Sequence, residues 1–308
     1  MEFSHISVLL SECIEGLDIK SDGIYVDCTA GGGGHSFEIA KRLSENGRLI
    51  SIDRDPEAIE AAGERLKAFP NAQVVRANFS EIDSVVKTAG ISAVDGVLFD
   101  LGVSSHQLDT AERGFSYKAD APLDMRMSKQ GLSARDVVNE YEETELARIL
   151  FEYGEERFSR QIAAAIVKSR QQKPIETTLE LAGIISSAVP AAARREKNPA
   201  KRSFQAIRIE VNKELDSLSD GLDRAFSVLG KGGRMCVISF HSLEDRLVKQ
   251  RFASWCRGCI CPPDFPVCVC HREPKAKLVC KKAILPGGEE LIKNSRSKSA
   301  KLRILEKL

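Results

Sequence analysis

The first hundred residues alternate short apolar runs with amphipathic stretches, and this rhythm constrains the fold more than any other feature of the sequence. The apolar runs predict four strands, which are GIYVDCTA, RLISIDRD, AQVVRANF and DGVLFDLG. Helical periodicity lies between them, over residues 36–44, 56–68 and in SEIDSVVKTAG. Strand and helix alternating at this spacing favour right-handed crossovers, which build a parallel sheet covered on both faces.

The rhythm breaks between residues 106 and 199, where the sequence shows helical periodicity without strand patterns. Ser133 and Asp136 have the spacing of an N-terminal capping box for one of these helices. After further helical sequence, GGRMCVISF predicts a strand that resumes the sheet, and SAKLRILEKL predicts a last, edge strand. We therefore expect an α/β domain of residues 1–105 and 200–308, interrupted by an all-helical insert of residues 106–199.

A glycine-rich turn follows the first predicted strand, in Asp27-Cys28-Thr29-Ala30-Gly31-Gly32-Gly33-Gly34-His35. Such glycines let the backbone approach a ligand and place free amides at a helix start. A dinucleotide site would carry G-x-G-x-x-G and hold a pyrophosphate on those amides. Asp27, directly before the turn, would repel a pyrophosphate and suits a cationic ligand such as S-adenosylmethionine.

Carboxylates also end the second and fourth predicted strands, at Asp53 and Asp100. Asp53 is placed to accept hydrogen bonds from ribose hydroxyls, and Phe79, expected to end the third strand, is placed to lie against an adenine ring. Ligands bind at this edge of open α/β sheets. The alternative is that the glycines only form a tight turn and the acids only cap helices, but acids after three strands disfavour it.

Long motifs then follow in the order DLGVSS, RGFS, PLDMRM, GEERF and SFHSLEDR. Together with HISVLL and GGGGHS, they resemble the bacterial 16S ribosomal RNA cytosine-N4 methyltransferases over nearly the whole chain. The resemblance implies a class I S-adenosylmethionine-dependent methyltransferase, with a Rossmann-like sheet and an inserted all-helical domain that helps to hold RNA. It also implies S-adenosyl-L-methionine as the cofactor, and a cytidine in the decoding centre of 16S rRNA in the small ribosomal subunit as the substrate.

The same resemblance carries over to single positions. The family holds its cofactor at the positions of Gly33, Gly34, His35, Asp53, Phe79, Asp100 and Gln107, which all have the expected residue type here. The chain departs from the family in a cysteine-rich C-terminal segment and in His106, where proline is common.

The exocyclic amine of cytosine is a poor nucleophile because its lone pair is delocalised into the ring. An enzyme helps by accepting a hydrogen bond from it and aligning it with the sulfonium methyl. Asp100 and His241 are predicted as the catalytic residues, although His241 fits a structural role equally well. The turn after Asp100 lacks the two prolines of DNA amino-methyltransferases and the cysteine of carbon-5 methyltransferases. The base would then stack on Phe115, Tyr117 or Phe240.

Two other functions stay open: an amino-methyltransferase of another RNA or of DNA, and a non-catalytic ribosome-assembly factor that only binds RNA. The net charge of +1 does not separate them. Three basic runs favour a surface that binds a polyanion. They are Arg194, Arg195, Lys197, Lys201 and Arg202; Lys275, Lys277, Lys281 and Lys282; and Lys293, Arg296, Lys298, Lys301 and Arg303.

The sequence has no apolar run near the roughly 18 to 20 residues that cross a bilayer, and no signal-peptide pattern. We expect a cytoplasmic protein without a membrane partner, and a homodimer is compatible with the sequence.

Six of the nine cysteines crowd into one C-terminal segment, at Cys256, Cys259, Cys261, Cys268, Cys270 and Cys280. In a reducing cytosol this crowding favours metal or redox chemistry over a disulfide scaffold. Cysteine pairs on either side of a proline-rich turn can form a structural zinc site, but Cys-x-Cys is a looser signal than Cys-x-x-Cys. Free thiols and redox behaviour are the alternatives, so the sequence assigns no metal.

Overall fold

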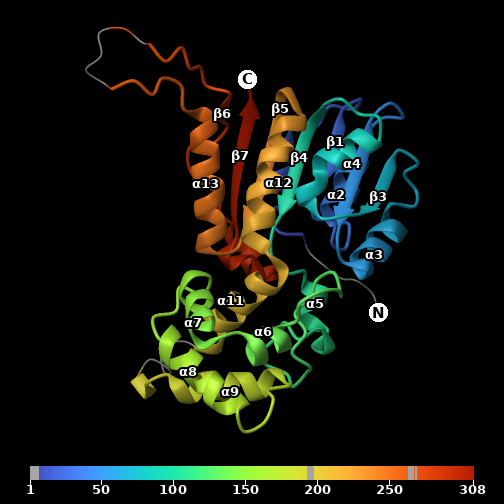
Figure 1. The fold of residues 1–308 in the computed structure, drawn as a ribbon. Helices are drawn as coiled ribbons and strands as arrows, with labels where there is room; N and C mark the ends of the chain where they lie inside the picture. The colour runs from blue at the N-terminus through green and yellow to red at the C-terminus, as the bar shows by residue number, and fades with distance from the viewer. Residues whose placement is uncertain (1–6, 193–197, 263–266, 268) are drawn as a thin grey trace. The chain divides into compact units, whose positions relative to one another are not determined.

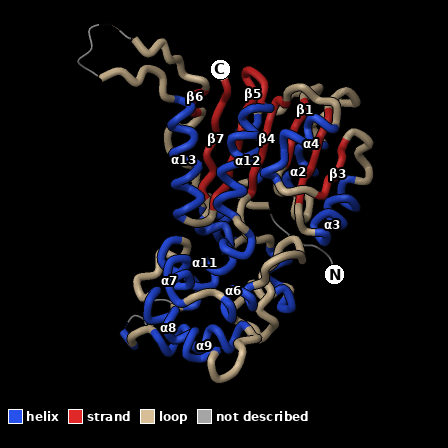
Figure 2. Tube along the Cα trace, in the orientation of Figure 1, coloured by secondary structure: helices blue, strands red, loops and turns tan. Residues whose placement is uncertain are grey.

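The structure is a computed structural model that describes residues 7–192, 198–262, 267 and 269–308. The chain divides into two compact units (Figures 1 and 2). Residues Met1–Gly102 and Asp216–Leu308 form an α/β unit, and residues Val103–Leu215 form a helical unit.

A seven-stranded sheet of order β3-β2-β1-β4-β5-β7-β6 forms the centre of the α/β unit (Figure 2). The strands β1 to β5 pair in parallel, whereas β7 runs antiparallel to both β5 and β6. This arrangement confirms the predicted Rossmann-like sheet. The strands are β1 (Ile24–Asp27), β2 (Arg48–Asp53), β3 (Ala72–Arg76), β4 (Val94–Asp100), β5 (Leu229–Ser239), β6 (Ala276–Leu278) and β7 (Lys301–Lys307).

Both faces of the sheet are covered, because successive residues of each central strand enter different apolar cores. In β4, Leu98 packs into a core with α1, α2 and α3, whereas Val97 and Phe99 pack into a core with α4, α12 and α13. This alternation explains why the strands read as continuous apolar runs. The helices of this unit are α1 (Leu10–Leu17), α2 (Gly34–Ala40), α3 (Pro56–Leu66), η1 (Phe79–Glu81), α4 (Ile82–Thr88), α12 (Glu214–Val228), α13 (Ser242–Cys256), α14 (Gly288–Lys293) and η3 (Ser295–Ser299).

The C-terminal strand is not the edge of the sheet, so that prediction is wrong. β7 lies between β5 and β6, and the three-residue strand β6 forms the edge. The sequence gives no alternating pattern that would reveal so short a strand. Lys277 of β6 pairs with Glu306 of β7 at 2.7 Å. A short, charged edge of this kind resists pairing with a further strand.

The helical unit has a separate apolar core, formed by residues such as Leu146, Ile162, Leu181 and Phe204. The predicted capping box is confirmed, because the Ser133 hydroxyl accepts the N–H of Asp136 at 3.2 Å and the Asp136 carboxylate accepts the N–H of Ser133 at 2.8 Å. Across the described residues, no helix of either unit is both long and apolar enough for a membrane crossing. The helices are α5 (Ser105–Asp109), η2 (Ala111–Arg113), α6 (Ala134–Glu140), α7 (Glu143–Glu152), α8 (Ser159–Arg170), α9 (Thr178–Ala188) and α11 (Ala200–Asn212).

The helical unit extends past residue 199, where the sequence analysis places the end of the insert. α11 accounts for the difference, since its residues Phe204, Ala206 and Ile207 belong to the core of the helical unit. Helical periodicity identifies the apolar face of such a helix but not the core that receives it.

Gly96 of β4 lies opposite Tyr25 of β1, and the pair gives a test of packing within the sheet. A Cβ atom on Gly96 would lie 2.7 Å from the Tyr25 ring and 3.1 Å from Leu17. The ring is buried, and its hydroxyl accepts the N–H of Lys20 at 2.7 Å, so it cannot move aside freely. We expect Gly96→Ala to lower the free energy of unfolding by about 1–3 kcal/mol, measured by urea denaturation.

Gly63→Ala is the matched control, because a Cβ atom on this glycine of α3 would meet no atom within 4 Å. Alanine in a helix then stabilises by about 0.5–1 kcal/mol. Equal stabilities for the two variants would contradict the packing argument.

Candidate cofactor and active site

Three carboxylates end neighbouring strands at one edge of the sheet. Asp27 ends β1, Asp53 ends β2 and Asp100 ends β4, and these strands are adjacent in the order β2-β1-β4. Because the strands are parallel, their carboxyl ends meet, as the sequence predicts. Burial raises the pKa of all three carboxyl groups.

Asp27 is buried, and its carboxylate is already occupied by protein donors. The Ser36 hydroxyl donates to it at 2.6 Å and the Thr29 N–H at 3.1 Å. Ser51, whose oxygen lies 2.8 Å from that of Ser36, must donate in turn, because Ser36 has only one hydroxyl proton. Asp27 therefore connects β1 to α2 and shapes the glycine turn.

The glycine turn leads into α2, with Gly33 as the N-cap residue at φ 73°. In this left-handed conformation a side chain is strained, and a Cβ atom would also lie 3.2 Å from Cα of Ala62. A Cβ atom on Gly34 would lie 1.9 Å from Oγ of Ser7, so the N-terminal segment lies directly against the turn. Gly33 thus needs glycine for its backbone conformation, whereas a side chain at Gly34 would require the Ser7 hydroxyl to move away.

Asp53 fixes the start of the turn, and its carboxylate can still accept hydrogen bonds from a ligand. Its two oxygens accept the N–H groups of Gly31 and Asp55, each at 2.9 Å. Each carboxylate oxygen has a second lone pair, which a ribose hydroxyl can use. A Cβ atom on Gly31 would meet nothing closer than the Thr29 carbonyl oxygen at 3.9 Å, so the backbone is open there.

Phe79 does not end the third strand, and that prediction is wrong. β3 ends at Arg76, and Phe79 begins η1, because Asn78 caps it by accepting the N–H of Ser80 at 3.0 Å. The Phe79 ring packs edge-on against Phe99, with ring centres 5.6 Å apart, and would contact a Cβ atom on Gly221. Its place beside an adenine ring stays a prediction.

Asp100 has one buried oxygen, Oδ1, without a hydrogen-bond partner among the described residues. Its other oxygen, Oδ2, lies 3.7 Å from Nδ1 of His35, too far for a hydrogen bond. Nε2 of His35 lies 3.1 Å from the Val8 carbonyl, which can only accept, so Nε2 carries a proton. Two states fit this geometry. In one, Nδ1 of His35 also carries a proton and pairs with an ionised Asp100. In the other, Nδ1 carries no proton and Asp100 is protonated.

Three acids lie close enough to Asp100 to act on its ionisation. Burial, followed by the charges of Asp27, Glu244 and Glu290, raises the pKa of Asp100 to about 8. The side chain keeps 20% of its surface exposed, so the group is still reachable. A carboxyl group with this pKa gains most from a cationic ligand, because the cation stabilises its charged form.

Several residues of this site escape the sequence analysis. The Thr29 hydroxyl accepts the Asp100 N–H at 2.7 Å, and Glu290 accepts the Leu9 N–H at 2.9 Å. Leu9 adopts φ 50°, a strained conformation for leucine, where the N-terminal segment passes His35. The position of Thr29 after Asp27 was a signal for its role, whereas nothing local in the sequence connects Glu290 with Leu9.

Residues 2–308 match the profile of the MraW methylase family. The chain belongs to this family. It is 58% identical over 309 residues to "Ribosomal RNA small subunit methyltransferase H" of Clostridium botulinum (strain Kyoto / Type A2), with 100% of both chains covered. It is 55% identical over 311 residues to the protein of the same name from Lachnospira eligens, covering 100% of this chain and 99% of that one. A solved rRNA methylase from Streptococcus thermophilus aligns at 12% identity and a TM-score of 0.44 over 99% of both chains.

His241 of this MraW-family methylase, whose methyl donor is S-adenosylmethionine, has the contacts of a helix cap. It is the N-cap residue of α13, and its Nδ1 accepts the N–H of Glu244 at 3.4 Å. Glu244 in turn accepts the N–H groups of Phe240 at 2.8 Å and His241 at 3.2 Å. Nε2 of His241 lies 3.1 Å from Glu244, but in an orientation that forms no hydrogen bond. These contacts orient Glu244, whose negative charge helps to raise the pKa of Asp100.

Gln107 and two of the three stacking candidates belong to the helical unit. Gln107 is buried and completes a capping box with Ser104, each accepting the other's N–H at 3.1 Å. Phe115 is buried in the core of the helical unit, and Tyr117 packs edge-on against Phe204. The third candidate, Phe240, is in the α/β unit and lies 3.5 Å from the position of a Cβ atom on Gly102.

Three residues of the basic runs, Lys277, Lys301 and Arg303, already have acidic partners, with Lys277 paired to Glu306 as described above. Asp245 of α13 pairs with Lys301 at 3.0 Å and with Arg303 at 2.7 Å. Arg194, Arg195 and Lys197 of the first basic run lie outside the described residues.

The raised pKa of Asp100 predicts how stability changes with pH. Between about 4, the value of a free aspartate, and about 8, the folded chain binds a proton that the unfolded chain does not. The free energy of unfolding therefore falls as pH rises through this window. Asp100→Asn cannot ionise, so without cofactor its Tm should exceed that of the wild type by roughly a few degrees near pH 8. The two values should converge toward about pH 4.

Asp83→Asn is the control, because Asp83 is a half-buried acid on α4 whose carboxylate is paired with Arg224 at 3.2 Å. It should show no such divergence from the wild type as pH rises. Parallel Tm profiles for Asp100→Asn and wild type would mean that Asp100 titrates normally.

Proposed function

We propose that this chain transfers the methyl group of S-adenosylmethionine to N4 of a cytidine in the decoding centre of 16S rRNA, in the cytoplasm. The observation that carries the proposal is Asp100, a reachable carboxyl group with a buried, unpartnered oxygen beside the glycine turn. Full-length relatives named for methylation of small-subunit ribosomal RNA support the substrate.

The residues at the sheet edge suit the two ends of such a cofactor. Asp53 has a lone pair left on each oxygen for ribose hydroxyls, and the backbone of Gly31 is open beside it. The acidic surroundings of Asp100 suit the ammonium and sulfonium groups. When bound, S-adenosylmethionine supplies a methyl group activated by the positive charge on its sulfur.

Asp100 changes its protonation state when positive charge arrives. Its pKa of about 8 keeps much of the carboxyl protonated at neutral pH in the free protein. A cation nearby lowers this pKa, so a proton leaves and the carboxylate becomes a full acceptor. When Asp100 is ionised, the exposed part of its carboxylate can accept a hydrogen bond from the exocyclic amine and increase the availability of the amine lone pair.

The transfer forms the N4–methyl bond as the methyl–sulfur bond breaks, and the surplus amine proton passes to solvent. His241 serves as a positioning residue through Glu244, which adds to the negative field at Asp100. We assign the helical unit and the remaining basic surface to RNA binding. The target base has to leave its stack, so phosphate contacts must hold the surrounding strand.

Methyl transfer to small ribosomal subunits tests the substrate. Subunits from cells that lack this chain should accept labelled methyl groups from S-adenosylmethionine, at one cytidine of 16S rRNA and at its N4 atom. Nucleotide mapping by mass spectrometry locates the product. Transfer to naked DNA or to another RNA, with none to 16S rRNA, would overturn the substrate assignment. Failure to bind S-adenosylmethionine in calorimetry would overturn the enzyme itself.

Two variants separate cofactor binding from turnover. Asp53→Ala removes the acceptor assigned to ribose and should weaken S-adenosylmethionine binding roughly tenfold, the effect of about 1.4 kcal/mol. Asp100→Ala should lower kcat at least as strongly, because it removes the acceptor for the amine. The control variant Asp83→Ala should change neither the affinity for S-adenosylmethionine nor kcat. Unchanged turnover in Asp100→Ala would contradict the assignment of this residue.

A further inference from the structure

An arm of the α/β unit leaves the end of α13 and returns to the start of β6 (Figure 1). Its base is anchored on α13, where the Lys275 N–H donates to the Trp255 carbonyl at 2.8 Å and the Arg272 side chain donates to the Ser254 carbonyl at 3.2 Å. Gly258 lies close to Pro274, since a Cβ atom there would be 3.1 Å from the proline ring. The two limbs are therefore held together where they join the helix.

Further out, the arm has little apolar packing to hold its limbs. Ile260, Val267 and Val269 are 49%, 70% and 63% exposed, respectively. Together with the polar residues around them, they form no core in the described part of the arm. A short segment without a core needs another constraint, such as a disulfide or a bound metal ion.

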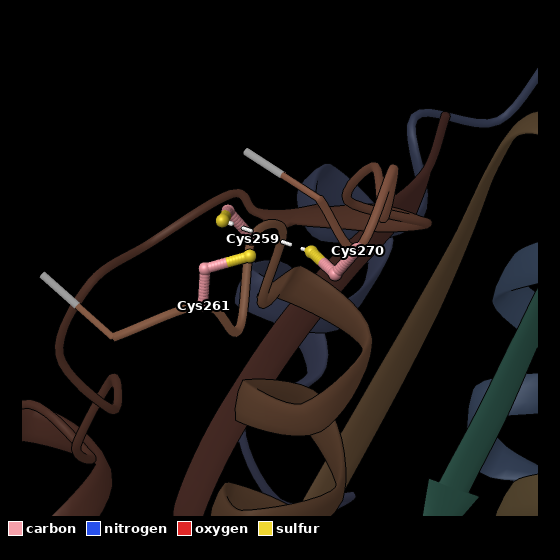
Figure 3. A group of neighbouring side chains, drawn as sticks. All are labelled: Cys259, Cys261 and Cys270. Atoms are coloured by element: carbon pink, nitrogen blue, oxygen red, sulfur yellow. Dashed lines mark hydrogen bonds between the residues drawn. The ribbon is translucent and has the colours of Figure 1, made fainter. Parts of the chain in front are cut away.

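Three cysteines bring the limbs together at this point. Cys259 and Cys261 come from the outgoing limb and Cys270 from the returning limb, and their side chains converge (Figure 3). All three Sγ atoms lie within 4.8 Å of one another. The two Sγ atoms that join the limbs, those of Cys259 and Cys270, are 3.7 Å apart.

This spacing fits one metal ion and does not fit a disulfide. Two thiolates bound to one tetrahedral zinc ion at about 2.3 Å each have their sulfurs about 3.8 Å apart. A disulfide would require about 2.05 Å. The 3.7 Å between Cys259 and Cys270 is therefore the separation expected across a zinc ion.

Backbone groups also donate to these sulfurs. The Ile260 N–H lies 3.4 Å from Sγ of Cys270, and the Val269 N–H lies 3.4 Å from Sγ of Cys261. Each contact crosses from one limb to the other. Donors aimed at sulfur stabilise thiolates and orient them as ligands, as is usual around protein metal sites.

We propose that Cys259, Cys261 and Cys270 bind a single zinc ion, which staples the two limbs of the arm and takes no part in methyl transfer. Zinc suits the site because thiolates prefer a soft ion and because the sulfurs are too close for a larger cluster. Cys268, which repeats the Cys-x-Cys spacing with Cys270, lies outside the described residues. The three thiolates leave one position of a tetrahedron for a further ligand.

Metal analysis of the full chain, purified under reducing conditions with zinc supplied and excess removed, tests the proposal. We expect about one zinc ion per chain in the wild type. Cys259→Ser and Cys270→Ser should lose it, whereas Cys280→Ser should keep it, because Cys280 is in the same segment but not in the cluster. Replacement of zinc by cobalt(II) should give thiolate charge-transfer absorption in the wild type and in Cys280→Ser only.

Two further readouts separate loss of the ion from loss of the fold. Cys259→Ser and Cys270→Ser should bind S-adenosylmethionine like the wild type, while limited proteolysis should cut their arms faster. A zinc-free wild type, or a Cys259→Ser or Cys270→Ser variant that retains zinc, would overturn the proposal. A disulfide between Cys259 and Cys270 in the wild type, despite purification under reducing conditions, would also overturn it.

Discussion

The desolvation of three like charges at one sheet edge is the constraint on which the rest of this structure depends. Parallel strands bring Asp27, Asp53 and Asp100 to that edge, and burial disfavours the charge of each. The Ser36 hydroxyl and the Thr29 N–H compensate Asp27, and the N–H groups of Gly31 and Asp55 compensate Asp53. The glycine turn takes its shape from these compensations, since Asp27 holds Ser36 of α2 and Asp53 holds the backbone of Gly31.

Asp100 is the exception, and the function proposed for it rests on its lack of compensation. Among the described residues, the cation-forming group recorded beside Asp100 is His35 at 3.7 Å, and Glu244 and Glu290 add further negative charge. A site built only for stability would supply a donor here, because an unsatisfied buried oxygen costs free energy. The missing interaction is one that a cationic cofactor can supply, and under the proposed function the loss of stability is offset by cofactor binding.

Local sequence predicted the parts of the site that strand ends and turns create. An apolar run closed by an acid located Asp53 and Asp100, and the glycines located the start of α2. Contacts between distant segments could not be predicted. An example is the hydrogen bond from the N–H of Leu9, near the N-terminus, to Glu290. The edge strand β6 and the placement of α11 were missed for a related reason. Their positions depend on which surface each segment packs against, and a local pattern does not contain that information.

The ionisation of Asp100 with and without cofactor tests the central claim most directly. Carboxyl titration by isotope-edited infrared spectroscopy, with Asp100→Asn to assign the signal, measures it. The account predicts a group in the free protein that ionises near pH 8. S-adenosylmethionine should move this ionisation well below neutrality. An ordinary aspartate pKa near 4 in the free protein, or a value that binding leaves unchanged, would contradict it.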